Sequence, residues 1–229
     1  VAKIGDNTSY PQAAALPLVS LTAVQALEQL DPAKCRSILI QAGAGGVGSF
    51  AIQYAKHVLK IETVATTASA GKADLLKELG ADLVIDYREH KFEDVIQDYD
   101  AVLDPMSWTY EKRTIGKGVL KSSGHYLSIG SSDSAFENGH ERSHGLLMVK
   151  NLIYSKIVNL IRTGRAPKYS LVIVEPNGER LQYVLDLVDK GLVKAVIDRT
   201  FPLTDAPDAF AYLEQGHATG KVILEHKKK

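Results

Sequence analysis

Short apolar runs alternate with amphipathic stretches along most of the chain. The first five runs are almost continuously apolar, and a helical pattern follows each of the first four; the runs occupy residues 37–42, 62–67, 82–87, 100–105 and 125–130. Parallel strands that are covered by helices on both faces have this appearance, because neither side of such a strand meets water. The pattern therefore predicts an α/β fold with a doubly wound parallel sheet, the Rossmann architecture.

The second half of the chain continues the alternation less regularly. A polar, glycine-containing stretch at 131–143 predicts a loop, and the periodicity of 145–162 predicts a long helix. A sixth strand is expected at 169–174 and a helix at 178–191. The chain then ends in a predicted strand–helix–strand unit, with its parts at 194–201, 208–216 and 221–225.

Composition narrows the classes of function. The 229 residues include 27 basic and 27 acidic side chains, so the net charge is zero and nothing favours a nucleic-acid partner. No apolar run approaches the ~20 residues of a membrane span. Cys35 is the one cysteine and is interpreted as structural, since a single thiol can form neither an internal disulfide nor a thiolate zinc site.

The stretch "AGAGGVG" follows the first predicted strand directly and opens the next helix. It contains the spacing G-x-G-x-x-G at Gly43, Gly45 and Gly48, which is typical of dinucleotide-binding loops when a strand precedes it and a helix follows. Gly43 would allow the tight turn, Gly45 the close approach of a pyrophosphate, and Gly48 the packing of helix on strand. A tight turn with incidental glycines is the alternative.

The end of the second strand predicts which dinucleotide binds. NAD sites usually place an acidic residue there, about 20 positions after the loop, to bind the ribose hydroxyl. Thr66 and Thr67 occupy this place, Lys72 follows, and the first carboxylate is Asp74. A lysine attracts the phosphate of NADPH, which a carboxylate would repel, so the expected cofactor is NADPH. The alternative for Lys72 is a solvated lysine at a helix end.

Longer stretches carry a resemblance to a known family. "AAALPLVSLTAVQAL", "ILIQAGAGGVGSFAIQYAK", "LKELGADLVIDYRE" and "FPLTDAPDAFAYLEQGHATGKVIL" are similar to the zinc-independent, zeta-crystallin-like quinone oxidoreductases of the medium-chain dehydrogenase/reductase superfamily. The similarity extends over nearly the whole chain. It implies hydride transfer from NADPH to a small-molecule acceptor, such as a quinone or an enone.

The resemblance also implies roles for individual residues. It assigns Gly45, Gly46, Val47 and Gly48 to the pyrophosphate loop, Lys72, Tyr87 and the neighbouring Ser69 to the adenosine phosphate, and Thr22 and Gly130 to the nicotinamide end. Many relatives carry a phosphate-binding arginine near "GHATGK", where this chain has His217 and Thr219. No side chain is assigned a catalytic role.

The same resemblance predicts a division of the chain. Residues 1–20 would be a linker or remnant of a barrel-like catalytic domain, 21–191 the Rossmann domain, and 192–229 a unit that normally packs with the catalytic domain. We therefore expect a fragment that binds the cofactor, turns over slowly by itself, and can form a homodimer through the edge of the sixth strand. A cytoplasmic location is expected, with an organellar one as the alternative.

Two rival functions remain open at this point. "HERSH", residues 140–144, fits the H-E-x-x-H pattern of zinc proteases, which requires a helix to aim both imidazoles at one metal. Asn138 and Gly139 before it and Gly145 after it are poor helix formers, so we predict an accidental match and no metal site. The other rival is a protein that binds the cofactor without turnover and acts as a sensor, a structural protein or an RNA-interacting protein.

Overall fold

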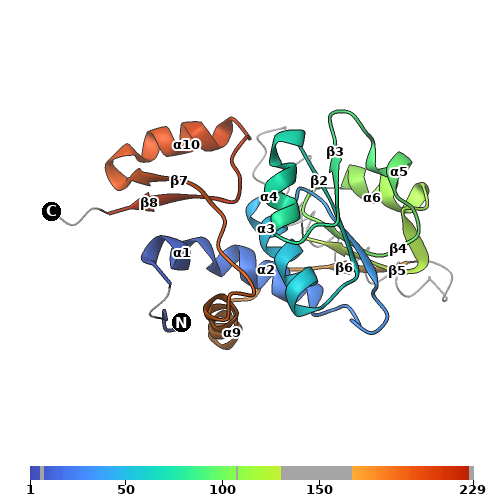
Figure 1. Ribbon diagram of the computed structural model, residues 1–229, viewed down its shortest axis with the longest axis horizontal. Helices are drawn as coiled ribbons and strands as arrows, with labels where there is room; N and C mark the ends of the chain where they lie inside the picture. Colours follow the sequence, from blue (N-terminus) through green and yellow to red (C-terminus); the bar gives the residue numbers. More distant parts are fainter. Residues whose placement is uncertain (6–7, 107, 130–166, 227–229) are drawn as a thin grey trace, which may run out of the picture.

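Six parallel strands form one sheet in the order β3-β2-β1-β4-β5-β6 (Figure 1). The computed structural model describes residues 1–5, 8–106, 108–129 and 167–226. The strands are β1 (Ser37–Ile40), β2 (Thr63–Ala68), β3 (Leu83–Asp86), β4 (Tyr99–Asp104), β5 (Leu120–Ser128) and β6 (Lys168–Leu171). The predicted doubly wound α/β fold is confirmed.

Both faces of the sheet are buried, which explains why the strand sequences are almost continuously apolar. Successive side chains of a strand point to opposite faces. In β1, Ile38 and Ile40 belong to one apolar core, whereas Leu39, between them, belongs to a second core on the other face. All three side chains have no exposed surface. Because each face has its own core, polar residues at alternate positions would be buried without partners.

Helices cover the two faces of the sheet. The first core is shared with α2 (Pro17–Leu27), α3 (Gly46–Gln53), α4 (Ala73–Glu78) and α9 (Gly178–Asp189). The second core is shared with α5 (Phe92–Val95) and α6 (Trp108–Gly116). α3 continues as a π-helical turn, η1 (Tyr54–Val58), and a 3-10 turn, η2 (Ala70–Lys72), leads into α4. The short helix α1 (Tyr10–Ala15) begins with a capping box formed by Ser9 and Gln12.

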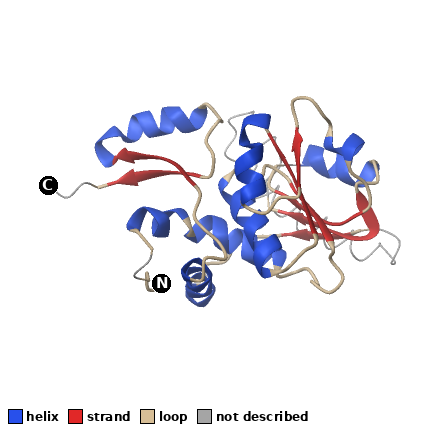
Figure 2. Ribbon diagram, viewed as in Figure 1, coloured by secondary structure: helices blue, strands red, loops and turns tan. Residues whose placement is uncertain are grey.

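A second, smaller unit lies beside the main sheet (Figures 1 and 2). In it β7 (Ile197–Pro202) and β8 (Lys221–Glu225) pair in parallel, and η4 (Leu203–Asp205) and α10 (Ala206–Glu214) connect them. The unit reaches the glycine loop, because the Gly220 N–H donates to the Ala44 carbonyl oxygen at 2.7 Å. The predicted domain division stays a prediction; α2 runs across its first boundary, at residues 20 and 21.

Some element ends differ from the sequence-based expectation. β5 begins at Leu120, five positions before the predicted start at His125, and β6 ends at Leu171, three positions before the predicted end. The pattern of apolar residues could not indicate the early start, because Ser122 and Ser123 are polar and exposed although they lie in the strand. The register between β4 and β5 also shifts between Tyr99 and Ala101. The helix predicted at 145–162 lies outside the described residues.

Two further expectations can be compared with the structure. Across the described ranges, no helix is long and apolar enough to span a membrane. Cys35 is buried, and burial raises the pKa of its thiol to about 12, so the thiol stays protonated at neutral pH, in keeping with a structural role. β6 is the last strand of the described sheet; its pairing with a second copy stays a prediction.

The buried imidazole of His125 generates a prediction about stability and pH. Burial, and next the charge of Lys168 on the paired strand, lowers the pKa of His125 from 6.5 to about 4, while its Nε2 lies 2.8 Å from the Ser170 Oγ. The unfolded chain therefore binds one more proton between these two pH values. The neutral, buried His125 therefore contributes its full stabilisation of the folded state above pH 6.5, and this contribution is lost as the pH falls towards 4. Within this window the equilibrium constant for unfolding should rise by about tenfold for each unit that the pH falls.

Denaturant unfolding of the wild type and of His125→Gln, at a series of pH values in this window, measures the effect. Glutamine keeps a polar side chain beside Ser170 but cannot titrate. Carboxylates titrate similarly in both proteins, so the difference between the two curves isolates the histidine. Parallel curves for the two proteins would contradict the assignment.

Candidate dinucleotide-binding site

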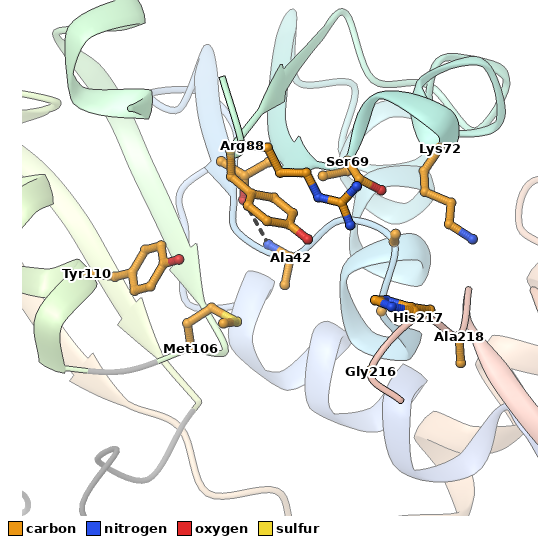
Figure 3. Close-up of a pocket in the computed structure, with 14 residues that line it drawn as sticks. Ala42, Ser69, Lys72, Arg88, Met106, Tyr110, Gly216, His217 and Ala218 are labelled. Atoms are coloured by element: carbon orange, nitrogen blue, oxygen red, sulfur yellow. Dashed lines mark hydrogen bonds between the residues drawn. The ribbon is translucent and has the colours of Figure 1, made fainter. Parts of the chain in front are cut away.

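A cleft of about 680 Å³ opens at the carboxyl edge of the parallel sheet, above β1 (Figure 3). β1 lies between β2 and β4, so the chain continues to opposite sides of it, and α/β proteins bind ligands at such a switch in strand order. Segments that follow β1, β2, β3 and β4 line the cleft together with one segment of the smaller unit. The lining residues are Ala42, Ala44, Gly45, Thr67, Ala68, Ser69, Lys72, Tyr87, Arg88, Met106, Tyr110, Gly216, His217 and Ala218.

Two glycines of the loop allow close packing beneath the cleft. A Cβ on Gly48 would lie 2.3 Å from the Ala42 carbonyl oxygen, so α3 can begin directly against the turn that leaves β1 only if this residue is glycine. A Cβ on Gly43 would lie 2.0 Å from the Thr66 Oγ1 on the neighbouring strand. Gly43 and Gly48 thus fix the position of the loop without contributing to the cleft surface.

The turn after β1 is held in an unusual backbone conformation. Ala42 has a φ of 52°, in the left-handed region that non-glycine residues seldom adopt. Its N–H donates to the Thr67 Oγ1 at 3.1 Å, and the Thr67 hydroxyl donates to the Gln41 Oε1 at 2.7 Å (Figure 3). The amide nitrogen of the buried Gln41 has no partner among the residues that the structure describes. This network explains how the strained turn stays in place.

The first turn of α3 directs peptide groups towards the cleft. Gly45 is the N-cap, and its carbonyl accepts the first helical hydrogen bond, from the Ser49 N–H. The N–H groups of Gly46, Val47 and Gly48 have no acceptor within the helix, as in the first turn of any α-helix. Such a terminus carries a partial positive charge and free donors, which suit a pyrophosphate.

Lys72 reaches the cleft from η2, next to Ser69 at the end of β2. Its ammonium group donates a hydrogen bond to the Thr219 Oγ1 of the smaller unit. Thr219 is itself held by Asp198 on β7, whose Oδ1 accepts the Thr219 N–H at 3.1 Å and whose Oδ2 accepts the Tyr212 hydroxyl. Because of this chain of hydrogen bonds, the smaller unit determines where the Lys72 amine lies.

The end of β3 forms the opposite wall. The Asp86 carboxylate accepts two backbone N–H groups, that of Ala70 at 3.0 Å and that of Arg88 at 2.9 Å. Both of its oxygens are therefore engaged in joining the segment after β2 to the segment after β3. Tyr87 and Arg88 follow at once, are exposed and line the cleft. None of the described lining residues carries a carboxylate.

The residues that the sequence predicted fall into two groups. Five of them line the cleft: Gly45, Thr67, Ser69, Lys72 and Tyr87. Others lie behind its wall, where the buried hydroxyls of Thr22 and Thr66 donate to the carbonyls of Leu18 and Ile40 at 2.7 and 2.6 Å. Gly46 packs against Val19 and Lys221, and Val47 against the first apolar core. Gly130 lies outside the described residues.

Arg88, Met106 and Tyr110 also line the cleft and were not predicted, whereas His217, in the segment Gly216–Ala218, lies where the resemblance places a phosphate-binding arginine in many relatives. Arg88 had a detectable signal, since it directly follows Tyr87 at the end of a predicted strand. Met106 and Tyr110 depend on the path of the chain after β4. The contact of Gly216–Ala218 depends on the pairing of Gly220 with the glycine loop, which joins segments far apart in the sequence.

The H-E-x-x-H match at 140–144 also lies outside the described residues. Within the described ranges, no three His, Cys, Asp or Glu side chains gather as metal ligands would. Asp104, at the end of β4, accepts the Tyr126 hydroxyl and the Met106 N–H. Burial, and next the Asp104 charge, raises the pKa of Tyr126, so this buried pair serves the structure of the strand ends.

Comparisons with known proteins find similar sequences among dehydrogenases and reductases. A family model described as zinc-binding dehydrogenase matches residues 79–224. The 2-methylene-furan-3-one reductase of Solanum lycopersicum is 37% identical over 220 residues, which are 95% of this chain and 47% of that protein. The chloroplastic NADPH-dependent alkenal/one oxidoreductase of Arabidopsis thaliana is 36% identical, over 95% of this chain and 48% of that protein.

A solved structure shows the same likeness in three dimensions. The quinone oxidoreductase from Coxiella burnetii superposes with a TM-score of 0.77 at 32% identity, over 98% of this chain and 63% of that chain. The chain thus spans about half of the length of the two plant relatives and somewhat more of the bacterial protein.

The different surroundings of two loop glycines generate a prediction. A Cβ on Gly45 would meet only the Ala42 carbonyl oxygen, at 3.3 Å, and Gly45 has an extended backbone that suits a branched residue. Gly45→Val should therefore keep the fold but occupy the cleft, and weaken the binding of NADPH at least tenfold. Gly48→Ala should instead lower the stability by about 1–3 kcal/mol, because its Cβ would overlap the backbone.

Cofactor titration and thermal unfolding of the two variants test both statements. Wild-type affinity in a folded Gly45→Val protein would place the phosphates elsewhere. Wild-type stability of Gly48→Ala would contradict the packing of α3 on the turn.

Proposed function

Because the chain belongs to the zinc-binding dehydrogenase family, in the quinone oxidoreductase and alkenal reductase group of the medium-chain dehydrogenase/reductase superfamily, we propose that it binds NADPH for hydride transfer to a quinone or an enone. The chain corresponds to about half of the plant relatives. Its own part in the reaction would be to bind and orient the cofactor.

The observation that carries the proposal is the charge of the cleft. Lys72 and Arg88 line it, and no carboxylate does so among the described residues. A dinucleotide without the adenosine phosphate is usually bound by an acidic residue at the end of the second strand, where this chain has Ala68 and Ser69. The carboxylate of Asp86 is near, but both oxygens already accept backbone N–H groups. The cleft therefore suits a ligand with an additional phosphate.

The glycine loop supports the same proposal at the other phosphates of the cofactor. The free N–H groups at the start of α3 would hold the pyrophosphate, and Gly45 presents no side chain that would obstruct it. Thr67 would contribute indirectly, because its hydroxyl holds the Ala42 N–H and the strained turn. The open surface at Gly45 and the free N–H groups thus support the proposal that the loop binds the pyrophosphate of a dinucleotide.

The reaction that we propose divides between cofactor and protein. A bound NADPH supplies a hydride from its nicotinamide, and the protein contributes position and electrostatics. The names of the plant relatives refer to a methylene-furanone and to alkenals or enones, and that of the bacterial structure to a quinone. These acceptors share a carbon–carbon double bond conjugated to a carbonyl group, so we propose this class of acceptor.

The preference for NADPH generates a prediction for Lys72. A partly exposed lysine contact with a phosphate contributes about 1.5–3 kcal/mol as a charge-assisted hydrogen bond, and solvent screening brings the value to the lower end. Lys72→Ala should therefore weaken the binding of NADPH about tenfold and leave that of NADH nearly unchanged. Added salt should reproduce part of the loss in the wild type, because the contact is electrostatic and partly exposed.

Isothermal titration of both cofactors measures these affinities. Lys77→Ala is the matched control, since it removes an exposed lysine outside the cleft, from α4, the helix that follows Lys72. Equal weakening of NADH and NADPH in Lys72→Ala would exclude Lys72 as a reader of the phosphate. A wild type that prefers NADH would contradict the proposed cofactor.

The acceptor is tested separately from the cofactor. Oxidation of NADPH is followed with a panel of quinones and enones, and with saturated ketones as controls. Consumption that requires the conjugated double bond supports the proposed reaction. Equal consumption with the saturated ketones would point to carbonyl reduction instead.

A further inference from the structure

Arg88 is a second cation in the wall of the cleft, on the side opposite to Lys72. Figure 3 shows its side chain extending across the cleft towards Ser69, with Lys72 beyond. Arg88 comes from the end of β3, whereas Lys72 comes from the turn after β2. The two positive groups therefore approach the region of Ser69 from different elements.

Hydrogen bonds of the Asp86 side chain and of the backbone hold the turn that carries Arg88. The Arg88 N–H donates to the Asp86 Oδ1, while the other oxygen of Asp86 accepts the Ala70 N–H, next to Ser69. The Tyr87 N–H also donates to the Ala68 carbonyl oxygen, at 3.3 Å. The Ala70 and Tyr87 hydrogen bonds join the end of β2 to the end of β3, and the Arg88 hydrogen bond holds the turn after β3, so the backbone that carries Arg88 has a defined position relative to Ser69.

The guanidinium group of Arg88 has no acidic partner in the part of the chain that the structure describes. It lies over the Tyr87 ring, 5.9 Å from its centroid, and it forms no ion pair with any residue that the structure describes. The adjacent carboxylate of Glu89 lies 4.0 Å from His90 instead. An exposed arginine that lines a cleft without a carboxylate leaves its donors free for a ligand.

We propose that Arg88 binds the 2′-phosphate of NADPH together with Lys72, and so determines the preference for NADPH over NADH. The inference rests on the proposed function, because it concerns the same cofactor. The planar guanidinium can donate two parallel hydrogen bonds to phosphate oxygens, which a lysine cannot do. Ser69 lies between the two cations and would add a hydroxyl donor, and Thr219 keeps the Lys72 amine on its side of the phosphate.

The experiment separates phosphate recognition from other contacts of an arginine. Binding of NADPH, NADH and 2′,5′-ADP is measured by calorimetry for the wild type, Arg88→Ala and Arg88→Lys. 2′,5′-ADP carries the phosphate in question but lacks the nicotinamide, so its binding does not depend on turnover. Lys91→Ala is the control, since it removes another exposed cation three residues away, outside the cleft.

Arg88→Ala should weaken NADPH and 2′,5′-ADP about tenfold and leave NADH unchanged. Arg88→Lys should recover part of the loss, because it restores the charge but not the paired donors, and Lys91→Ala should match the wild type. Unchanged binding of 2′,5′-ADP in Arg88→Ala would overturn the inference. Equal weakening of NADPH and NADH would do so too, since it would show a contact with the adenine or the ribose.

Different results would contradict the role of Arg88 and the binding of NADPH itself. If the wild type binds NADPH tightly and Arg88→Ala does the same, only the role of Arg88 is wrong. If the wild type binds neither NADPH nor 2′,5′-ADP, the proposed function is wrong and the role of Arg88 with it. Thermal unfolding of Arg88→Ala should equal that of the wild type, because the side chain is exposed and forms no ion pair in the described structure.

Discussion

The cleft depends on one close contact, that between the first turn of α3 and the turn that leaves β1. There is no space for a Cβ at Gly48, because that atom would lie 2.3 Å from the Ala42 carbonyl oxygen. Ala42 itself has a left-handed backbone conformation. The contact places the start of the helix directly above the end of the strand. The free N–H groups at the start of α3 then lie next to the carboxyl end of β1, where the strand order changes direction. The other lining residues surround this end of β1.

The walls come from elements that the sheet and its hydrogen bonds bring together. Asp86 connects the ends of β2 and β3, so that Ser69, Lys72, Tyr87 and Arg88 share one edge. The smaller unit contributes through Asp198 and Thr219, which hold Lys72 from the other side. The carboxylates of Asp86 and Asp198 therefore accept hydrogen bonds from backbone N–H groups and from the Tyr212 hydroxyl. Neither carboxylate lines the cleft, whose charged lining residues are Lys72 and Arg88.

Much of this arrangement could be predicted from the sequence. The apolar runs indicated the buried strands, since each face of the sheet has its own core. The position of Gly43, Gly45 and Gly48 between a strand and a helix indicated a dinucleotide-binding loop. The local pattern also indicated Lys72, because the first charged residue after β2 is a lysine and not an acid. These features depend on residues close together in the chain, where periodicity and turn chemistry are informative.

Other features could not be read from local pattern. β5 begins with Leu120, but the next three residues, Lys121, Ser122 and Ser123, are polar, so the apolar pattern does not indicate the start of the strand. The contact between Gly220 and the glycine loop joins positions about 175 residues apart, and only the tertiary structure shows it. The hydrogen bond that the Thr22 hydroxyl donates to the Leu18 carbonyl could not be read from the sequence either, and the assignment of Thr22 to the nicotinamide end stays a prediction.

In our proposal a dinucleotide lies across the start of α3, with its adenosine phosphate between Lys72 and Arg88. A crystal structure of the chain with NADPH would test this arrangement. We expect pyrophosphate oxygens within hydrogen-bond distance of the N–H groups of Gly46 and Val47, and the 2′-phosphate between the two cations. A cofactor bound away from the glycine loop, or one whose 2′-phosphate points to solvent, would contradict it.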